Sequence, residues 1–326
     1  MKVLLTGANG FVGSHVLDRL RAAGVATRLL LRAHSDTTFI QAHLPACEIT
    51  RGSLEDPEAL ARAVDGVTHV VHAAGATKAL TPAGLYAANQ LGTRHLVQAL
   101  GRAGPGRRLI LLSSLAVSGP GTRAQPARED RPPQPLSEYG RSKLAAEREV
   151  ESLAPGDRVI LRLAAVYGPR DREFLRLFRA AARGWTPLFG GGRQELSLVW
   201  APDVAEVVWR ALNTPLPEAP VVQVAGPQSV TAAELAAAIA QALGRRTRRL
   251  WLPRAVLPVV CGLAAGWARL SRRATLLAHG KHRELTAPGW VADTERLRCW
   301  LGEVCATPLA EGLAATARWY REAGWL

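Results

Sequence analysis

The sequence lacks the patterns that would indicate a metal site, a membrane span or an exported chain. Its four cysteines form no CxxC pair and have no histidine-rich neighbourhood, so we expect free thiols in a reducing cytoplasm and no metal. No apolar run reaches the length of about 20 residues that a membrane-spanning helix needs. No signal-peptide pattern precedes the first motif. These absences predict a soluble, cytoplasmic protein.

Lysine is also scarce, although the chain is strongly basic. The formal net charge is +14, and only 4 of the 41 basic residues are lysine. A basic surface attracts nucleotide cofactors, acidic substrates or anionic membranes. The basic residues form no run interleaved with aromatic residues, and helix-turn-helix and zinc-finger spacings are missing. We therefore expect a small-molecule substrate and no nucleic acid.

Apolar strand patterns alternate with helical patterns through the first half of the chain. The expected strands are residues 2–6, 26–31, 67–73, 108–113 and 158–163, and the expected helices are 11–23, 85–103 and 137–152. Such alternation is typical of a parallel sheet covered by helices on both faces. We therefore expect an α/β fold with a doubly wound parallel sheet.

A glycine-rich turn joins the first expected strand to the first expected helix. Gly7, Gly10 and Gly13 permit a tight turn there, and they let backbone N–H groups approach a pyrophosphate at the start of the helix. This placement indicates a Rossmann domain that binds a dinucleotide. We expect that domain to span residues 1–165. Residues 166–326 are expected to form mainly a smaller C-terminal substrate-binding lobe, with some segments returning to the first domain.

Tyr139 and Lys143 lie four residues apart in an expected helix, so they share one face. A nearby ammonium favours a phenolate, and we expect it to lower the pKa of Tyr139 toward working pH, as a proton-transfer group requires. Ser114 lies at the end of the preceding strand, 25 positions upstream of Tyr139, and Asn89 lies on the helix before that strand. Without these two residues, a solvated helical surface would be the simpler interpretation of the spacing.

Six motifs resemble, in order and spacing, those of the extended short-chain dehydrogenase/reductase family, which includes the NAD-dependent epimerases and dehydratases. The motifs are TGANGFVG at 6–13, HAAG at 72–75, NQLGT at 89–93, SSLAVSG at 113–119, YGRSK at 139–143 and LRLAAVYGP at 161–169. The resemblance covers at least residues 1–230. It implies an NAD(P)-dependent oxidoreductase.

The resemblance also implies a role for each residue of the expected active site. Tyr139 would exchange a proton with the substrate oxygen, and Lys143 would hydrogen-bond the nicotinamide ribose and tune Tyr139. Ser114 would hold the substrate oxygen and stabilise the charge that develops there, with Ser113 as the alternative. Asn89 is expected to support the active site structurally, with a direct catalytic role as the alternative.

The resemblance, together with the chemistry of residues outside the six motifs, gives the expected contacts of the cofactor and the substrate. For the cofactor they are Gly7, Asn9, Gly10, Phe11, Val12, Gly13, Arg32, Ser35, Ser53, Leu54, Ala73, Ala74, Asn89, Tyr139 and Lys143. For the substrate they are Lys78, Ser114, Ala165 and Val166.

The end of the second expected strand favours NADP as the cofactor, with NAD as the alternative. NAD-binding domains usually carry an acidic residue there for the ribose 2′-hydroxyl, and residues 28–35 contain none. Arg32 and Ser35 are suited to a 2′-phosphate instead, because arginine offers a bidentate fork. The other interpretation is that Arg32 only lies along the adenine. Ser53 stands where most family members carry an aspartate, so the adenine contacts are expected to differ.

Two substitutions argue against a nucleotide-sugar substrate. Sugar-nucleotide members usually carry an asparagine where this chain has Ala164-Ala165, and an arginine where it has Leu196. A buried diphosphate needs paired donors, and Arg193 is an alternative partner for it. The leading hypothesis is hydride transfer to or from a carbonyl or hydroxyl of a small, largely apolar substrate. The alternatives are a nucleotide-sugar epimerase or dehydratase with tightly bound NAD, and a non-catalytic NADP-binding sensor.

Residues 251–270 form an apolar segment that arginines follow. The segment resembles the lobe of dihydroflavonol reductase-like and 3β-hydroxysteroid dehydrogenase-like members. It is expected to line a pocket for a lipid-like substrate or to touch a membrane surface peripherally, with an ordinary core helix as the alternative. Pro253 and Pro258 disfavour one long regular helix. The resemblance also implies a homodimer through the helices at about 85–103 and 137–152.

Overall fold

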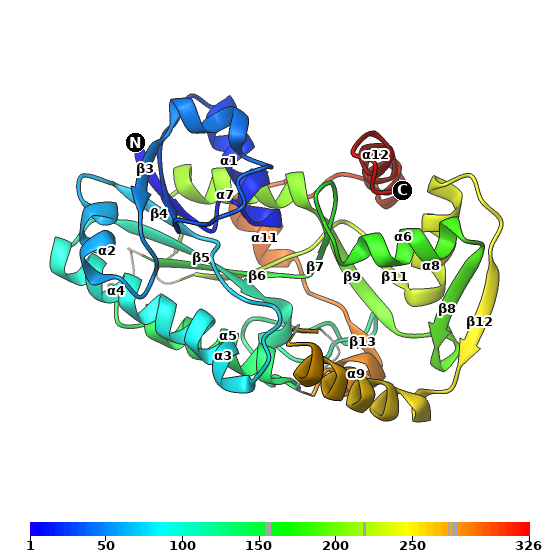
Figure 1. Ribbon diagram of the computed structural model, residues 1–326. Helices are drawn as coiled ribbons and strands as arrows, with labels where there is room; N and C mark the ends of the chain where they lie inside the picture. Colours follow the sequence, from blue (N-terminus) through cyan, green and yellow to red (C-terminus); the bar gives the residue numbers. More distant parts are fainter. Residues whose placement is uncertain (154–157, 218–219, 273, 276–279) are drawn as a thin grey trace.

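A seven-stranded parallel sheet forms the centre of the molecule (Figure 1). The computed structural model describes residues 1–153, 158–217, 220–272, 274–275 and 280–326. The strands of the large sheet are β1 (Lys2–Thr6), β2 (Ala26–Leu31), β3 (Glu48–Arg51), β4 (His69–His72), β5 (Arg108–Ser114), β6 (Arg158–Leu163) and β10 (Val221–Val224). Their order is β10-β6-β5-β4-β1-β2-β3, so the direction of winding reverses between β1 and β4. This confirms the doubly wound α/β fold, in which ligands bind beside that reversal.

Helices cover both faces of the large sheet, and each face has its own apolar core. On one face lie α1 (Phe11–Ala22), α7 (Ala201–Asn213) and α11 (Glu295–Leu301). On the other face lie α2 (Pro57–Val64), α4 (Gly92–Ala103) and α5 (Glu138–Val150). Neighbouring strand residues enter opposite cores: Val3 and Leu5 belong to the first, and Leu4 belongs to the second. Burial on both faces explains why these strands are continuous apolar runs in the sequence.

Most of the expected elements in the first half of the chain have nearly the expected bounds. The strands β1, β2 and β6 span the expected residues, and α1 ends at Ala22 rather than at residue 23. The helix expected at 85–103 is instead divided into α3 (Pro82–Tyr86), a π-helical turn η2 (Ala87–Leu91) and α4. A π turn is a local widening of a helix that occurs frequently at functional sites.

The remaining strands form two smaller sheets. The four-stranded sheet contains β7 (Ala165–Tyr167), β9 (Glu195–Trp200), β11 (Ser229–Thr231) and β13 (Gly289–Trp290), and the two-stranded sheet contains β8 (Trp185–Phe189) and β12 (Arg248–Leu252). The helices α6 (Phe174–Ala182), α8 (Ala232–Ala242) and α12 (Leu309–Glu322) pack around a buried cluster that includes Tyr167, Phe178 and Tyr320.

The apolar segment 251–270 is part strand and part helix. After β12, a short turn η6 (Arg254–Val256) leads into α9 (Leu257–Ser271), against which α10 (Lys281–Thr286) packs. The segment is therefore not one long regular helix, as its two prolines led us to expect. Pro258 lies in the first turn of α9, where a proline removes no helical hydrogen bond, and Pro253 precedes the helix. The other short turns are η1 (Gln41–Ala46), η3 (Leu115–Val117) and η5 (Gly190–Gly192).

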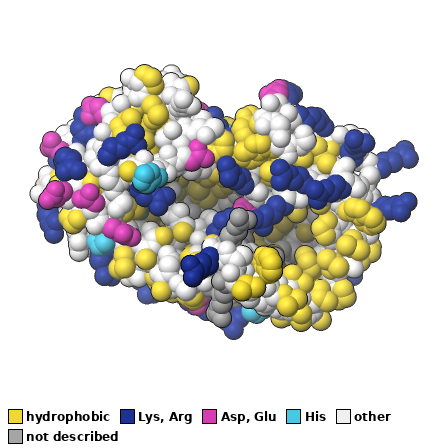
Figure 2. Space-filling view, viewed as in Figure 1, with side chains coloured by type: hydrophobic (Ala, Val, Ile, Leu, Met, Phe, Trp, Pro, Cys, Tyr) yellow, Lys and Arg dark blue, Asp and Glu magenta, His cyan; other side chains and the backbone are white. Residues whose placement is uncertain are grey.

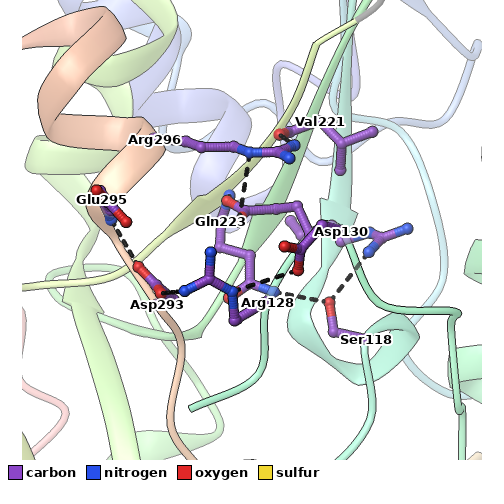
Figure 3. A network of polar contacts seen from close by, with 10 residues as sticks. Ser118, Arg128, Asp130, Val221, Gln223, Asp293, Glu295 and Arg296 are labelled. Carbon is purple, nitrogen blue, oxygen red and sulfur yellow. Dashed lines mark hydrogen bonds and ion pairs between the residues drawn. The ribbon is translucent and has the colours of Figure 1, made fainter.

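A polar network fastens the proline-rich segment at 120–135 to the C-terminal part of the chain (Figure 3). Arg128 Nη1 lies 3.0 Å from Oδ2 of Asp293, just before α11. The Gln223 amide of β10 donates a hydrogen bond of 3.0 Å to the Ser118 hydroxyl. Together with α7, β10 and α11 bring residues from beyond position 165 into contact with the large sheet. The domain boundary at 165 stays a prediction.

Candidate active site

The turn between β1 and α1 requires glycine at two positions. Gly7 has a φ of 71°, and its carbonyl oxygen accepts a hydrogen bond of 3.0 Å from the Gly10 nitrogen. A Cβ atom on Gly13 would lie 2.1 Å from the Gly7 oxygen, and one on Gly7 would lie 2.6 Å from the Ala74 nitrogen. The turn brings the chain close to the N-terminus of α1 without side chains in between. This fits the pyrophosphate of a dinucleotide.

A cavity of about 550 Å³ lies where the carboxyl ends of β4, β5 and β6 face the smaller sheets. Figure 2 shows the surface hollowed near the middle of the molecule. The expected site residues that border the cavity are Phe11, Val12, Ala73, Lys78, Asn89, Ser114, Tyr139, Lys143, Ala165 and Val166. Leucines form much of the remaining wall: Leu85, Leu112, Leu115, Leu163, Leu177, Leu196, Leu198, Leu235 and Leu285. The structure thus brings the expected catalytic and substrate residues together in one mainly apolar cavity.

Among the expected cofactor residues that do not border this cavity, four follow β2 and β3. Arg32 is exposed directly after β2, and its carbonyl oxygen accepts a hydrogen bond of 3.1 Å from the Ser35 nitrogen. Ser53 follows β3, and its hydroxyl accepts a hydrogen bond of 3.1 Å from the Glu55 nitrogen. Leu54 beside it is half-buried. All four follow strands that run parallel to β1, so they lie at the same edge of the sheet as the glycine turn.

Asn9 holds the loop that follows β2, and that loop contains an acidic residue that the sequence argument did not consider. The Asn9 amide donates a hydrogen bond of 3.1 Å to the backbone oxygen of Asp36. The Asp36 carboxylate accepts hydrogen bonds from the hydroxyl of Thr38 at 2.6 Å and from its nitrogen at 3.0 Å. These bonds hold the pKa of Asp36 below its usual value. The carboxylate is therefore occupied by hydrogen bonds within its own loop.

Ser114 and Tyr139 meet at one wall of the cavity. Ser114 ends β5, Tyr139 lies in the first turn of α5, and their side chains are close enough to interact. Burial raises the pKa of Tyr139 to about 12, although the interaction with Ser114 lowers it. The expectation of a lowered pKa is therefore wrong for this structure. The free-energy cost of removing the phenolate from water is larger than the stabilisation that its contacts with the protein provide.

Lys143 lies one helical turn from Tyr139 and is buried. Its Nζ donates a hydrogen bond of 2.7 Å to the backbone oxygen of Leu112 in β5. Burial lowers the pKa of Lys143 to about 8, and the negative charge of Glu147 works against this shift. Lys143 therefore loses its proton more readily than an exposed lysine does.

The two serines at the end of β5 have different partners, although both border the cavity. The Ser113 hydroxyl donates a hydrogen bond of 2.5 Å to the Glu147 carboxylate. Glu147 also forms a buried ion pair with Arg162, with 2.8 Å between Oε2 and Nη2. No carboxylate among the described residues bonds Ser114, and its hydroxyl accepts a hydrogen bond of 3.2 Å from the Ala116 nitrogen. The Ser114 hydroxyl can therefore interact with Tyr139, and this supports Ser114 over Ser113 as the residue that holds the substrate.

Asn89 is buried in the π-helical turn, where its hydrogen bonds connect separate segments around the cavity. Its Oδ1 accepts a hydrogen bond of 2.8 Å from the Ala76 nitrogen, and its Nδ2 donates to the Ala76 oxygen at 2.9 Å. Nδ2 also donates to the Ser142 hydroxyl of α5 at 2.9 Å. These contacts agree with the interpretation of Asn89 as a structural support.

Three residues that form ion pairs in the cavity wall were not anticipated from the sequence. Glu173 pairs with the expected substrate residue Lys78, with 2.7 Å between Oε1 and Nζ. Glu284 and Lys281 of α10 form a second ion pair in the cavity wall. No local pattern marks Glu284 or Glu173, because their places depend on how the distant segments pack.

Comparison with known proteins supports the resemblance. The profile of the NAD dependent epimerase/dehydratase family matches residues 3–225. The chain is 30% identical to the ceramide reductase of Caulobacter vibrioides over 324 residues, which cover 99% of this chain and 96% of that protein. It is 29% identical to the N-acetyl-alpha-D-glucosaminyl-diphospho-ditrans,octacis-undecaprenol 4-epimerase of Escherichia coli, over 81% of this chain and 78% of that protein.

Solved structures show the same fold over the whole chain. The structure of MoeE5 in complex with UDP-glucuronic acid and NAD matches with a TM-score of 0.78 and 27% identity, over 99% of this chain and 100% of that chain. The expected family and enzyme class are therefore confirmed. The protein is an NAD(P)-dependent oxidoreductase of the extended short-chain dehydrogenase/reductase type, and it belongs to the NAD dependent epimerase/dehydratase family.

Proposed function

We propose that the protein transfers a hydride between NADP(H) and the carbonyl or alcohol carbon of a largely apolar substrate. The observation that carries this proposal is the meeting of the Ser114 and Tyr139 side chains in the wall of a mainly apolar cavity. An apolar pocket with a few convergent polar groups is the usual form of a small-molecule site. A nicotinamide cofactor bound along the turn from Gly7 to Gly13 would supply or accept the hydride.

Three side chains act on the substrate oxygen in this proposal. The Ser114 hydroxyl holds the carbonyl oxygen and stabilises the negative charge that develops on it. In the reducing direction, the Tyr139 hydroxyl gives its proton to that oxygen. A pKa of about 12 keeps Tyr139 protonated at neutral pH, as a proton donor requires. The positive charge of Lys143 stabilises the phenolate that Tyr139 becomes.

The cavity suits an apolar substrate better than a nucleotide sugar. Leu196 borders it where sugar-nucleotide members usually place an arginine, and Arg193 is exposed and does not border it. Lys78 and Lys281 do border it, but each is already paired with a carboxylate. The carboxylates of those pairs would repel a diphosphate, because like charges placed together are unfavourable. The relative in Caulobacter, whose name is ceramide reductase, agrees with this choice.

Replacing Tyr139 with phenylalanine tests the chemistry. Tyr139→Phe removes the proton donor and leaves the ring in place, so kcat for reduction of a long-chain ketone should fall by at least about 100-fold. NADPH oxidation measures the rate, and unchanged NADPH affinity shows that the variant is folded. Wild-type turnover in this variant would contradict the proposal. Stoichiometric NAD that remains bound through purification, together with binding of UDP-sugars, would favour the epimerase instead.

The preference for NADP rests on Arg32, which is exposed at the edge of the sheet where the adenosine ribose of a dinucleotide would lie. Arg32→Ala should weaken NADPH binding by about tenfold and leave NADH binding nearly unchanged, because only NADPH carries the 2′-phosphate. Fluorescence titration with both cofactors measures this. Arg102→Ala, at an exposed position in the last turn of α4, is the control. An equal loss for the two cofactors would remove the role given to Arg32.

We also propose a homodimer through α4 and α5, and a cytoplasmic location stays a prediction. Leu91, the last residue of η2 before α4, is 39% exposed, which is consistent with a contact between subunits on this side of the molecule. Light scattering coupled to size exclusion should give twice the mass of 34.9 kDa. A monomeric mass at micromolar concentration would contradict the proposed dimer.

We further propose that α9 and β12 rest on an anionic membrane surface. Val259, Leu263, Trp267 and Leu270 repeat along one face of α9, and each is more than 60% exposed. Figure 2 shows that hydrophobic side chains gather over α9, with arginines along the edge of this patch. Such an apolar face with basic residues around it is typical of a surface that lies at the lipid headgroups.

The charge of the segment supports an anionic membrane as the partner. Residues 235–283 contain nine arginines and no aspartate or glutamate. Trp251 of β12 is 52% exposed and extends the apolar surface. In the part of the chain that the structure describes, no helix is long and apolar enough to cross a bilayer, so the contact would be peripheral. Because α10 packs on α9 and also borders the cavity, an apolar substrate dissolved in lipid would lie close to the active site.

Sedimentation with vesicles tests this surface. The protein should sediment with phosphatidylglycerol-containing vesicles and much less with pure phosphatidylcholine, because arginines favour anionic headgroups. Replacing both Leu263 and Trp267 with serine should reduce the bound fraction by about tenfold or more. The control is Ile49→Thr, which changes an exposed apolar residue of β3. Equal binding of the wild type and the double variant would contradict the proposal.

A further inference from the structure

Glu284 places a buried carboxylate in the wall of the active-site cavity. It lies on α10 and is only 6% exposed, although it borders the cavity. Its Oε1 accepts a hydrogen bond from the hydroxyl of Ser137, and its Oε2 pairs with the ammonium of Lys281. The proposed hydride transfer uses none of these three groups, so the structure holds a charged pair beside the reaction that the chemistry does not account for.

The backbone around Glu284 is fixed by two further hydrogen bonds. Its carbonyl oxygen accepts from Gln194 Nε2 at 2.8 Å and from Trp290 Nε1 at 2.9 Å. Both donors come from other segments that also border the cavity. Glu284 is buried, but the side chain of Lys281 is 32% exposed, and a partly exposed ion pair contributes little net stability. A fixed pair of charges in a pocket wall is therefore better explained by a ligand than by folding.

Glu284 is also coupled to the proton donor. Ser137, which donates to Glu284, caps α5 by accepting a hydrogen bond of 3.1 Å from the Gly140 nitrogen, and Tyr139 lies in that first turn. The negative charge of Glu284 raises the pKa of Tyr139. An anion beside Tyr139 opposes the phenolate that forms when Tyr139 gives up its proton. A substrate group that donates a hydrogen bond to Glu284 would weaken this opposition.

The pair also limits what that substrate group is. A carboxylate accepts hydrogen bonds and an ammonium donates them, so Glu284 and Lys281 together suit a group that does both. N–H and O–H groups next to a carbonyl meet this requirement, and a plain hydrocarbon chain does not. The leucine walls of the cavity suit the rest of such a molecule.

We propose, on the basis of the proposed reductase function, that Glu284 and Lys281 select a substrate that carries an N–H or O–H donor close to the reacting carbonyl. Glu284 accepts the hydrogen bond of that donor, and Lys281 binds the accompanying acceptor. The substrate class is thus a long-chain ketone with an amide or hydroxyl group next to the carbonyl. Glu284 is a specificity-determining residue in this scheme, and Tyr139 remains the proton donor.

Three ketones of equal chain length test the proposal: a 2-acylamino-3-ketone, a 2-hydroxy-3-ketone and the plain 3-ketone. The wild type should prefer at least one of the first two over the third by about tenfold or more in kcat/KM. Glu284→Gln keeps the shape of the side chain and removes its charge, so most of this preference should disappear, mainly through KM. Glu311→Gln, at an exposed position of α12 outside the cavity, is the matched control.

A pH profile supplies a second readout that a purely structural role would not move. Glu284→Gln should shift the midpoint of alcohol oxidation to lower pH, because loss of the negative charge makes Tyr139 easier to deprotonate. If Glu284→Gln does not fold, Lys281→Met serves instead and should reduce the same preference. Unchanged preference ratios in a folded variant would overturn the inference and leave the reductase intact. No turnover of any of the three ketones would overturn the reductase itself, and the inference with it.

Discussion

Two neighbouring serines of β5 show how contacts beyond the strand assign different roles to similar residues. Ser113 is engaged by Glu147, and Glu147 is held by Arg162 in a buried ion pair. Ser114 instead meets Tyr139. Both partners lie on α5, with Tyr139 in its first turn and Glu147 about two turns further along. The serine that points toward Tyr139 is therefore available to a substrate, and its neighbour belongs to the support behind it.

Alanine substitution at each serine tests this division. Ser114→Ala should lower kcat by about 100-fold or more, because it removes a donor to the developing oxyanion. Ser113→Ala should keep kcat within about tenfold and lower the free energy of unfolding by about 1 kcal/mol, because it removes one buried hydrogen bond. Ketone reduction and urea denaturation measure the two effects. The reverse pattern would transfer the substrate role to Ser113.

At the scale of elements, the β1–α1 connection depends on backbone contact rather than on side-chain chemistry. The Gly13 position in α1 approaches the Gly7 carbonyl so closely that a Cβ would lie 2.1 Å from its oxygen. Gly101 in α4 is also helical, but it is exposed and a Cβ there would meet no atom within 4 Å. The two glycines have the same helical setting and differ only in what surrounds them.

The variants Gly13→Ala and Gly101→Ala should therefore have opposite effects. Gly13→Ala should lower the free energy of unfolding by about 1–3 kcal/mol, because the turn must move to admit the methyl group. It should also weaken NADPH binding by at least about tenfold, since the phosphate approach depends on that turn. Gly101→Ala should raise stability by roughly 0.5 kcal/mol, because alanine favours a helix over glycine. Equal stability of the two variants would show that the turn adapts without cost.

At the scale of the whole molecule, two buried histidines couple the stability of the fold to pH. His15 Nε2 of α1 lies 2.9 Å from the carbonyl oxygen of Pro169, which follows β7. His72 of β4 lies between the hydroxyls of Thr6 and Thr93, at 2.7 and 3.0 Å. Burial lowers the pKa of His15 to about 4 and that of His72 to about 3. Both are therefore neutral in the folded protein at neutral pH.

The free energy of unfolding should decrease as the pH falls from about 6.5 to about 4. In this range the unfolded chain binds protons at both histidines and the folded chain does not, so protonation favours unfolding. At pH 5 the loss should be about 2 kcal/mol for each histidine relative to pH 7. Urea denaturation at the two pH values measures it. His72→Gln should reduce the loss of unfolding free energy between pH 7 and pH 5 by about 2 kcal/mol, the contribution of one histidine. An unchanged loss would exclude His72 as a cause.

The amino-acid sequence by itself determined the features that depend on neighbouring residues. The strand β1, the glycine turn and α1 follow one another within 22 residues, and local periodicity and backbone freedom are enough to predict them. The spacing of Tyr139 and Lys143 in α5 is equally local. The family resemblance then supplied the roles of Ser114 and its partners.

The tertiary structure decided the features that depend on burial and on contacts between distant segments. Glu284 reaches the cavity from α10, and no sequence pattern connects it with Tyr139. The pKa of Tyr139 is raised rather than lowered, because burial outweighs the local spacing with Lys143. The outer face of α9 is exposed although its composition also suits a core helix. Electrostatic energy and solvent exposure depend on everything that surrounds a group in space, and only the folded chain specifies those surroundings.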